Sequence, residues 1–141
     1  MLILPSLLWR EIEERSRRAL PDEACGLLLG MRRGREVEVA ALACARNLAL
    51  DPRSSFELDP LDAIAAEDGA RSVGLLIVGV WHSHPRGPRV PSPQDLAGAD
   101  TAWLTLIAVP QPRFGIELSC WQSDGAQFTP LEIAQTLSTH G

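Results

Sequence analysis

The stretch 75–84 reads LLIVGVWHSH and carries the strongest strand signal of this chain. Its first seven residues carry no charged side chain, and a short apolar run of this kind predicts a strand. His82 and His84 stand at its end, two residues apart. Because side chains alternate along a strand, both rings should lie on the same face. The stretch therefore predicts a strand that ends in a pair of histidines.

The segments around this strand predict helices and strands in mixed order. Apolar spacing, N-cap residues and prolines predict helices over 6–20, 61–72 and 92–99, and a short helix in the tail from Pro130. Strands are expected at 24–31, 36–43, 56–58, 103–109, 114–122 and 126–129, with hairpins between the first two and the last two. This order is neither strictly alternating nor all-β. The sequence therefore predicts an α/β (mixed α+β) fold with a mixed central β-sheet flanked by helices.

Length and composition indicate one ordinary globular domain over 1–141. The chain is 45% hydrophobic and 22% charged, with a formal net charge of −5. No nucleic-acid partner is expected, because binding a phosphate backbone needs a concentrated positive face. No membrane association is expected either, because no apolar stretch is long enough to span a bilayer. The apolar start MLILPSLLWR lacks the positive n-region and cleavage site of a signal peptide.

The cysteines indicate a reducing compartment. Cys25, Cys44 and Cys120 are far apart and odd in number, and no CxxC pair is present. This pattern implies no disulfide framework. We therefore expect a cytoplasmic protein.

His82, His84 and Asp95 form a candidate metal site. The loop 85–91, PRGPRVP, contains three prolines and is too stiff for regular structure, so it can bring Asp95 back to the strand end. Two ring nitrogens and one carboxylate make a three-ligand zinc site with its fourth position open for water, as in catalytic zinc sites. Zinc in such a site lowers the pKa of water towards about 7 and polarises a scissile carbonyl. The remaining histidine, His140, is expected to be exposed to solvent.

Each part of this pattern also has a purely structural interpretation. Two histidines near a strand end can be hydrogen-bonded core or loop residues. The run 92–95, SPQD, is typical of a helix N-terminus. Ser92 would be the N-cap, Pro93 the first helical residue, and Asp95 would reach back as in a capping box. The two interpretations of this run are compatible, since a helix start fixes a ligand rigidly.

A family resemblance follows from the spacing. His82-x-His84, then seven residues, Ser92, two residues and Asp95 resembles the signature of the JAMM (MPN-plus) zinc metalloproteases. The segment 22–30, DEACGLLLG, resembles the glutamate-bearing region of that family and puts Glu23 at the place of the glutamate. The segment 47–60, which contains FELDP, resembles the small bacterial branch of sulfur-carrier-processing peptidases. The resemblance covers 21–109 and implies an MPN/JAMM-like fold with cytidine-deaminase-like layering.

The resemblance implies a role for each of these residues. The ligands of one catalytic Zn²⁺ are His82, His84 and Asp95. Glu23 accepts a proton from the attacking water and passes it to the leaving amine. Ser92 donates a hydrogen bond to the oxyanion of the tetrahedral intermediate. Only the resemblance selects Glu23 from among the acidic residues of the chain.

The resemblance also implies a substrate. Family members cleave a peptide or isopeptide bond after the C-terminal Gly-Gly tail of a ubiquitin-like or sulfur-carrier protein. The short loop 85–91 leaves no room for the insertions with which eukaryotic members grip a second ubiquitin. Arg86 and Arg89 in this loop are candidates for holding a substrate carboxylate, because arginine pairs with carboxylates in a bidentate manner. We expect a monomer or homodimer.

Two other functions remain open from the sequence. A zinc-binding adaptor or scaffold domain without turnover would keep the three ligands and make Glu23 unnecessary. A zinc deaminase would carry His-x-Glu and a later Cys-x-x-Cys. Here the residue two after His82 is His84, and the sequence contains no Cys-x-x-Cys.

Overall fold

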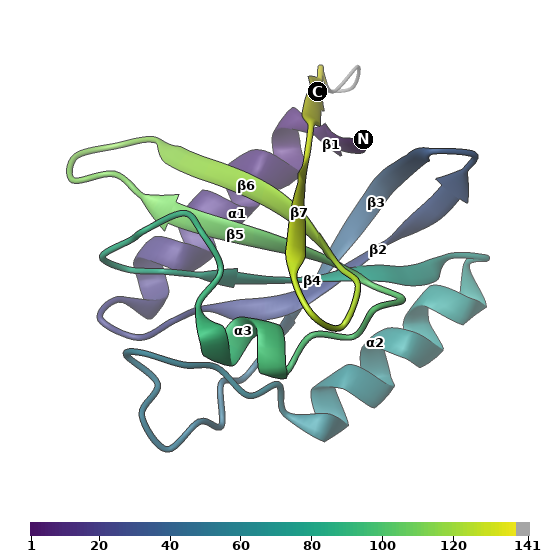
Figure 1. Cartoon of the computed structure of the whole chain (residues 1–141). Helices are drawn as coiled ribbons and strands as arrows, with labels where there is room; N and C mark the ends of the chain where they lie inside the picture. The colour runs from purple at the N-terminus through teal and green to yellow at the C-terminus, as the bar shows by residue number, and fades with distance from the viewer. Residues whose placement is uncertain (138–141) are drawn as a thin grey trace.

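The computed structural model describes residues 1–137 and shows a mixed sheet with helices packed on it (Figure 1). Within this range the helices are α1 (Ser6–Ala19), α2 (Pro60–Ser72) and α3 (Pro93–Ala97). The eight strands of the same range are β1 (Leu2–Pro5), β2 (Cys25–Arg33), β3 (Glu36–Ala45), β4 (Leu76–Ser83), β5 (Leu104–Pro110), β6 (Ile116–Ser123), β7 (Phe128–Leu131) and β8 (Ile133–Thr136). The predicted mixed α+β class is confirmed. The expectation for His140 lies outside the described residues.

The predicted histidine-bearing strand is present as β4 and lies inside the sheet. The strand order is β7-β6-β5-β4-β2-β3-β1-β8, so β4 has neighbours on both sides. It pairs antiparallel with β2 and parallel with β5. The expected hairpins are also present, since β2 pairs antiparallel with β3, and β6 with β7.

The tail does not form the predicted helix from Pro130. The chain stays extended through β7 and β8, which are separated only by Glu132. β7 pairs with β6 at one edge of the sheet, and β8 pairs parallel with β1 at the other. Figure 1 shows this segment rising past the sheet to the N-terminal strand. The prediction was wrong because pairing with a strand about 130 residues earlier outweighed a weak local helix preference.

The structure differs from the prediction in two further places. β1 was not predicted, because four residues are too few for a periodic signal and its partners, β3 and β8, are distant in sequence. The expected strand at 56–58 is reduced to one isolated bridge between Asn47 and Leu58. The side chain of Asn47 bonds to the backbone of Ser55, Ala49 and Glu57, which takes the place of a regular ladder here.

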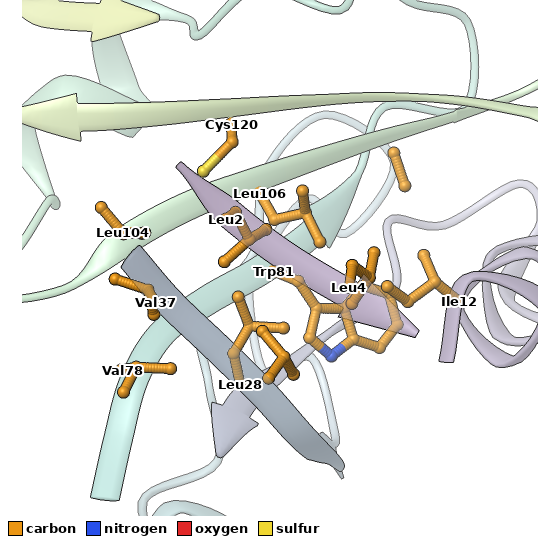
Figure 2. Close-up of a cluster of buried hydrophobic side chains, with 12 residues drawn as sticks. Leu2, Leu4, Ile12, Leu28, Val37, Val78, Trp81, Leu104, Leu106 and Cys120 are labelled. Carbon is orange, nitrogen blue, oxygen red and sulfur yellow. The ribbon is translucent and has the colours of Figure 1, made fainter. Parts of the chain in front are cut away.

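Two clusters of buried side chains lie on opposite faces of the sheet. Adjacent β2 residues belong to different clusters, Leu28 to the one that contains Ile12 of α1 and Leu27 to the one that contains Ala66 of α2. Figure 2 shows the indole of Trp81 in the first cluster, beside Leu4 and Ile12. Because side chains alternate, the histidine that follows Trp81 faces the α2 side. None of the helices in residues 1–137 is both long and apolar enough to cross a membrane.

Gly26 allows Trp81 to pack closely against β2. A Cβ at Gly26 would lie 2.5 Å from Trp81 Nε1 and would collide with the carbonyl oxygen of Ala43. We expect Gly26→Ala to lower the free energy of unfolding by about 1–3 kcal/mol, because the core is overpacked. Urea unfolding measures this change.

Gly69→Ala is the matched control. A Cβ at Gly69 meets no atom within 4 Å, and this glycine lies inside α2. It should therefore raise the free energy of unfolding by about 0.5–1 kcal/mol. Equal effects of the two substitutions would contradict the packing described for Trp81.

Candidate functional site

The imidazoles of two histidines and one carboxylate converge at the end of β4. His82 Nε2 and His84 Nε2 lie 3.1 Å apart. The Asp95 carboxylate spans both rings, with Oδ1 3.1 Å from His82 Nε2 and Oδ2 3.2 Å from His84 Nε2. None of these side chains is more than 9% exposed. The structure thus brings the three predicted ligands together in one buried cluster.

Strand pairing and a helix start position these groups. In the sheet His82 lies between Cys25 of β2 and Ile107 of β5, so its backbone is held on both sides. α3 begins with a capping box, in which Asp95 N donates to Ser92 Oγ at 3.0 Å and Ser92 N donates to Asp95 Oδ2 at 2.8 Å. The structural interpretation of run 92–95 is confirmed. The same capping box aims Asp95 at the histidines.

The loop after β4 sets the tautomer of His84. Its Nδ1 lies 2.7 Å from the carbonyl oxygen of Pro88. A carbonyl only accepts hydrogen bonds, so Nδ1 carries the proton and Nε2 of the neutral ring presents a lone pair. This lone pair faces the Asp95 carboxylate and His82 Nε2. Lone pairs repel at these distances unless a proton or a metal ion lies between them.

The charges of the cluster follow from burial and from these contacts. Burial opposes a charge on Asp95, but hydrogen bonds from His82 and from the cationic form of His84 outweigh it and hold the pKa of Asp95 below its usual range. Burial lowers the pKa of His82. Burial opposes a charge on His84 as well, but the Asp95 carboxylate and the Pro88 carbonyl raise the pKa of His84 overall. Cationic His84 carries a second proton on Nε2, toward Asp95, and a metal ion bound at Nε2 would take the place of this second proton.

Glu23 lies beside the cluster, two residues before the start of β2. It is 5% exposed, and its Oε1 has no hydrogen-bond partner among residues 1–137. Ligand-type atoms of Glu23, His82 and His84 all lie within 4.8 Å of one another. The loop after β3 clamps its backbone, because Glu23 N donates to Pro52 O at 2.7 Å and Asn47 Nδ2 donates to Glu23 O at 3.1 Å. Burial raises the pKa of Glu23 to about 7.

Two cavities in the described part of the chain adjoin the cluster. The first, here called the channel, has a volume of about 300 Å³ and reaches His82 and Asp95 between 55–58 and the region of α3. The second, here called the cleft, has a volume of about 640 Å³ and is lined by Glu23, His84 and Ser92 together with loop 85–91. The channel and the cleft share no lining residue, so the cluster stands between them.

The two arginines predicted for substrate binding are placed differently. Arg86 lines the cleft. Arg89 does not: its guanidinium lies 4.0 Å from Glu117, and its carbonyl accepts a hydrogen bond from Ser119 Oγ. Arg53, which sequence reasoning did not single out, lines the cleft as well.

Comparison with known proteins identifies the family of the chain. A family model described as prokaryotic homologs of the JAB domain matches residues 5–123. The chain belongs to this family. The resemblance to the small bacterial branch of JAMM proteins is thereby confirmed, and the chain is a JAMM-type isopeptidase.

Two named proteins and one solved structure are similar to this chain over most of its length. A desampylase from Haloferax volcanii is 33% identical over 115 residues, which cover 81% of this chain and 78% of the relative. A probable TtuB-protein conjugate cleaving protease from Thermus thermophilus is 32% identical over 99 residues, 70% of this chain and 64% of the relative. The solution structure of a protein from Desulfitobacterium hafniense superposes with a TM-score of 0.86 at 30% identity, covering 98% and 94% of the two chains.

The cluster of this JAB-family chain fits a zinc ion. Ligand atoms about 2.0–2.1 Å from one tetrahedral ion lie about 3.3 Å from one another. The two ring nitrogens are 3.1 Å apart, close to this value, and each has a different oxygen of Asp95 at a similar distance, Oδ1 3.1 Å from His82 and Oδ2 3.2 Å from His84. The lone pair imposed on His84 Nε2 and the unpartnered Oε1 of Glu23 also favour a cation at this place.

Sequence reasoning missed several residues that shape this site. Phe56 stacks on the ring of His82, with centroids 4.3 Å apart and planes at 21°. Pro88 orients His84 through its carbonyl, and Asn47 holds the backbone of Glu23. Asn47 and Phe56 both lie in the segment 47–60 that carried part of the family resemblance, which was the one signal that pointed to them.

Proposed function

We propose that this chain is a zinc-dependent hydrolase that cleaves a peptide or isopeptide bond after the C-terminal Gly-Gly tail of a ubiquitin-like or sulfur-carrier protein. The observation that carries the proposal is the convergence of His82, His84 and Asp95 beside the buried Glu23. The names of the relatives, a desampylase and a TtuB-protein conjugate cleaving protease, support the cleavage of ubiquitin-like protein conjugates.

The proposed ligands of one zinc ion are His82 Nε2, His84 Nε2 and the Asp95 carboxylate. Two carboxylates compete for the third position, since Glu23 also lies within reach of both histidines. We assign Asp95 as the ligand, because its oxygens are 3.1 and 3.2 Å from the ring nitrogens and its capping box holds it there. Zinc bound here lowers the pKa of water and polarises the scissile carbonyl.

Glu23 serves as the proposed general base. Its unpartnered Oε1 is free to accept a proton from the attacking water and to pass that proton to the leaving amine. A pKa of about 7, raised by burial, suits both steps near neutral pH. The contacts of Glu23 with Pro52 and Asn47 use only its backbone, so they leave the carboxylate available.

The proposed donor to the oxyanion is Ser92. Its Oγ accepts the N–H of Asp95, and this contact leaves the hydroxyl proton free. The side chain lines the cleft beside His84 and Glu23. The hydroxyl can therefore donate to the oxygen on which negative charge develops.

We predict that Ser92→Ala lowers kcat by about 10²-fold, by the loss of one oxyanion donor. The substitution also removes an N-cap, which costs about 1 kcal/mol of stability. Ser92→Thr keeps a hydroxyl and should restore most of the rate. Steady-state kinetics of both variants test the assignment, and a Ser92→Ala enzyme with wild-type kcat would remove Ser92 from the mechanism.

The channel offers a place for a Gly-Gly tail. It is about 300 Å³ in volume, and small side chains or none form part of its wall, at Gly98, Ala99 and Thr105. Such a passage admits an extended chain without bulky side chains and excludes a folded one. His82 and Asp95 are among the residues that line it, so a tail bound there lies beside the proposed zinc ligands.

We further propose that the protein acts in the cytoplasm, as a monomer or homodimer, on a soluble carrier. The three cysteines are free, with Cys25 and Cys120 buried. Burial raises the pKa of each of these two thiols to about 12, which favours inert packing over redox chemistry.

Mass spectrometry of a model substrate tests the proposed function. A ubiquitin-like carrier extended by a few residues beyond Gly-Gly is incubated with zinc-loaded protein, with and without a chelator. We expect a product that ends at the second glycine and that is absent when the chelator is present. Cleavage elsewhere, or cleavage that survives removal of zinc, would refute the proposed reaction.

A further inference from the structure

The cleft carries two positive charges that the described residues do not neutralise. Arg53 and Arg86 both line it. Within residues 1–137 neither guanidinium has a hydrogen-bond or ion-pair partner. The single acidic residue among the described lining of the cleft is Glu23, whose carboxylate is beside the histidines.

The backbone around Arg53 is tied to the proposed base. Ser54 N and Ser55 N both donate to Asp51 O, at 3.2 and 3.1 Å, and close a turn that contains Arg53. The residue before Arg53 is Pro52, whose carbonyl accepts the N–H of Glu23 at 2.7 Å. Arg53 therefore directly follows, in sequence, a residue that is hydrogen-bonded to Glu23.

The backbone around Arg86 is tied in the same way to a proposed ligand. Gly87 N donates to His84 O at 3.0 Å, which closes a turn with Pro85 and Arg86 at its centre. The His84 ring also holds Pro88, two residues after Arg86. The two arginines thus belong to two different loops, each fixed by hydrogen bonds to a residue of the reactive centre.

We propose that Arg53 and Arg86 together bind a carboxylate on the leaving group. This inference rests on the proposed function, which places the scissile bond at the cluster between the channel and the cleft. The tail fills the channel, and the leaving group has to lie next to Glu23, which returns the proton to the leaving amine. Glu23 lines the cleft and one other cavity, and of these two the cleft is the one that His84 and Ser92 also line, so the leaving group occupies the cleft. A guanidinium pairs with a carboxylate through charge-assisted, bidentate hydrogen bonds.

The carboxylate can come from two sources. It is either the free α-carboxylate of a leaving amino acid or an acidic side chain next to the scissile bond in a longer leaving group. Both present the same anionic, planar group to the two arginines. A leaving lysine within a protein, with no carboxylate close to its ε-amine, would be the poorer substrate.

Two matched pairs of substrates test the proposal and distinguish the sources. All carry the same Gly-Gly carrier; one pair is extended by alanine as the free acid or the amide, the other by aspartate amide or asparagine amide. In at least one pair, we expect the kcat/KM of the acidic member to exceed that of the neutral member by about tenfold or more, because of the charge-assisted hydrogen bonds. A preference in the alanine pair identifies the α-carboxylate, and one in the aspartate pair identifies a side chain. Equal rates within both pairs overturn the proposal.

Variants connect this preference to the two arginines. The double substitution Arg53→Gln/Arg86→Gln should bring the acid-to-neutral ratio close to one, because the ratio within each pair cancels any effect that is common to both substrates. Arg71→Gln removes the same kind of charge from α2, where Arg71 pairs with Glu67, and should leave the ratio unchanged. A ratio that persists in the double variant would also overturn the proposal.

A binding measurement separates this proposal from the proposed function. If no substrate is cleaved, the proposed function fails. Calorimetry then measures the dissociation constants of the acidic and the neutral substrate of each pair. The protein used is zinc-loaded Glu23→Gln, so that no substrate is turned over. Tighter binding of an acidic member, lost in the added arginine double variant, supports the carboxylate site. Equal dissociation constants contradict it.

Discussion

Glu23→Gln is expected to lower kcat by about 10²–10⁴-fold, the contribution of a positioned general base, while zinc stays bound. The amide keeps the volume of the side chain but does not accept and return a proton. The contacts that hold this residue run through its backbone to Pro52 and Asn47, so the fold should survive. Steady-state kinetics and metal content measure the two effects on the same sample.

Glu67→Gln is the matched control for this prediction. Glu67 is an exposed carboxylate on α2 that pairs with Arg71, and its loss should leave kcat unchanged. Full activity of Glu23→Gln would show that the assigned base is wrong. Loss of zinc from Glu23→Gln would show instead that Glu23 is a ligand. A wild-type protein that holds zinc but turns over no conjugate would favour the adaptor function.

Asp95→Ala is expected to abolish activity by loss of the metal. This carboxylate is within 3.2 Å of both ring nitrogens, and without it only two histidines remain of the proposed three-ligand set. We expect the affinity for zinc to fall by more than about 100-fold, since loss of an outer partner of a ligand already costs about 10–100-fold. Competition with a chromogenic chelator measures the affinity.

Asp95 also closes the capping box of α3, so a control must separate the two roles. Ser92→Ala removes the other half of the same box without removing a ligand. It should leave the affinity for zinc within a few-fold of wild type. If the two substitutions weaken zinc binding equally, Asp95 acts through the helix start and not as a ligand.

The sequence predicted the part of the fold that local pattern determines. The run 75–84 carried its own signal, because a buried central strand is apolar along its length, and it became β4. The SPQD run specified the start of α3 through cap chemistry that involves only neighbouring residues. β1 and β8 were missed because their extended form depends on pairing with each other across the whole chain.

The site was predictable to the extent that its residues are close in sequence. His82, His84 and Asp95 have a spacing with chemical meaning, and the structure places them together. Glu23 joins them only because β2 pairs with β4, which no local pattern reveals, and only the family resemblance selected it. Arg53 reaches the cleft because its loop folds back on Glu23. Arg86 and Arg89 belong to the same loop, but only Arg86 lines the cleft, since Arg89 pairs with Glu117 outside it.

Anomalous diffraction at the zinc edge, from a crystal of the zinc-loaded protein, locates the metal and its ligands in one experiment. We expect one strong peak, with His82 Nε2, His84 Nε2 and an Asp95 oxygen each about 2.0–2.2 Å from it. We also expect the Glu23 carboxylate nearby but outside bonding distance. A peak bonded to Glu23 in place of Asp95, or no peak at this cluster, would show that the proposed zinc site is wrong.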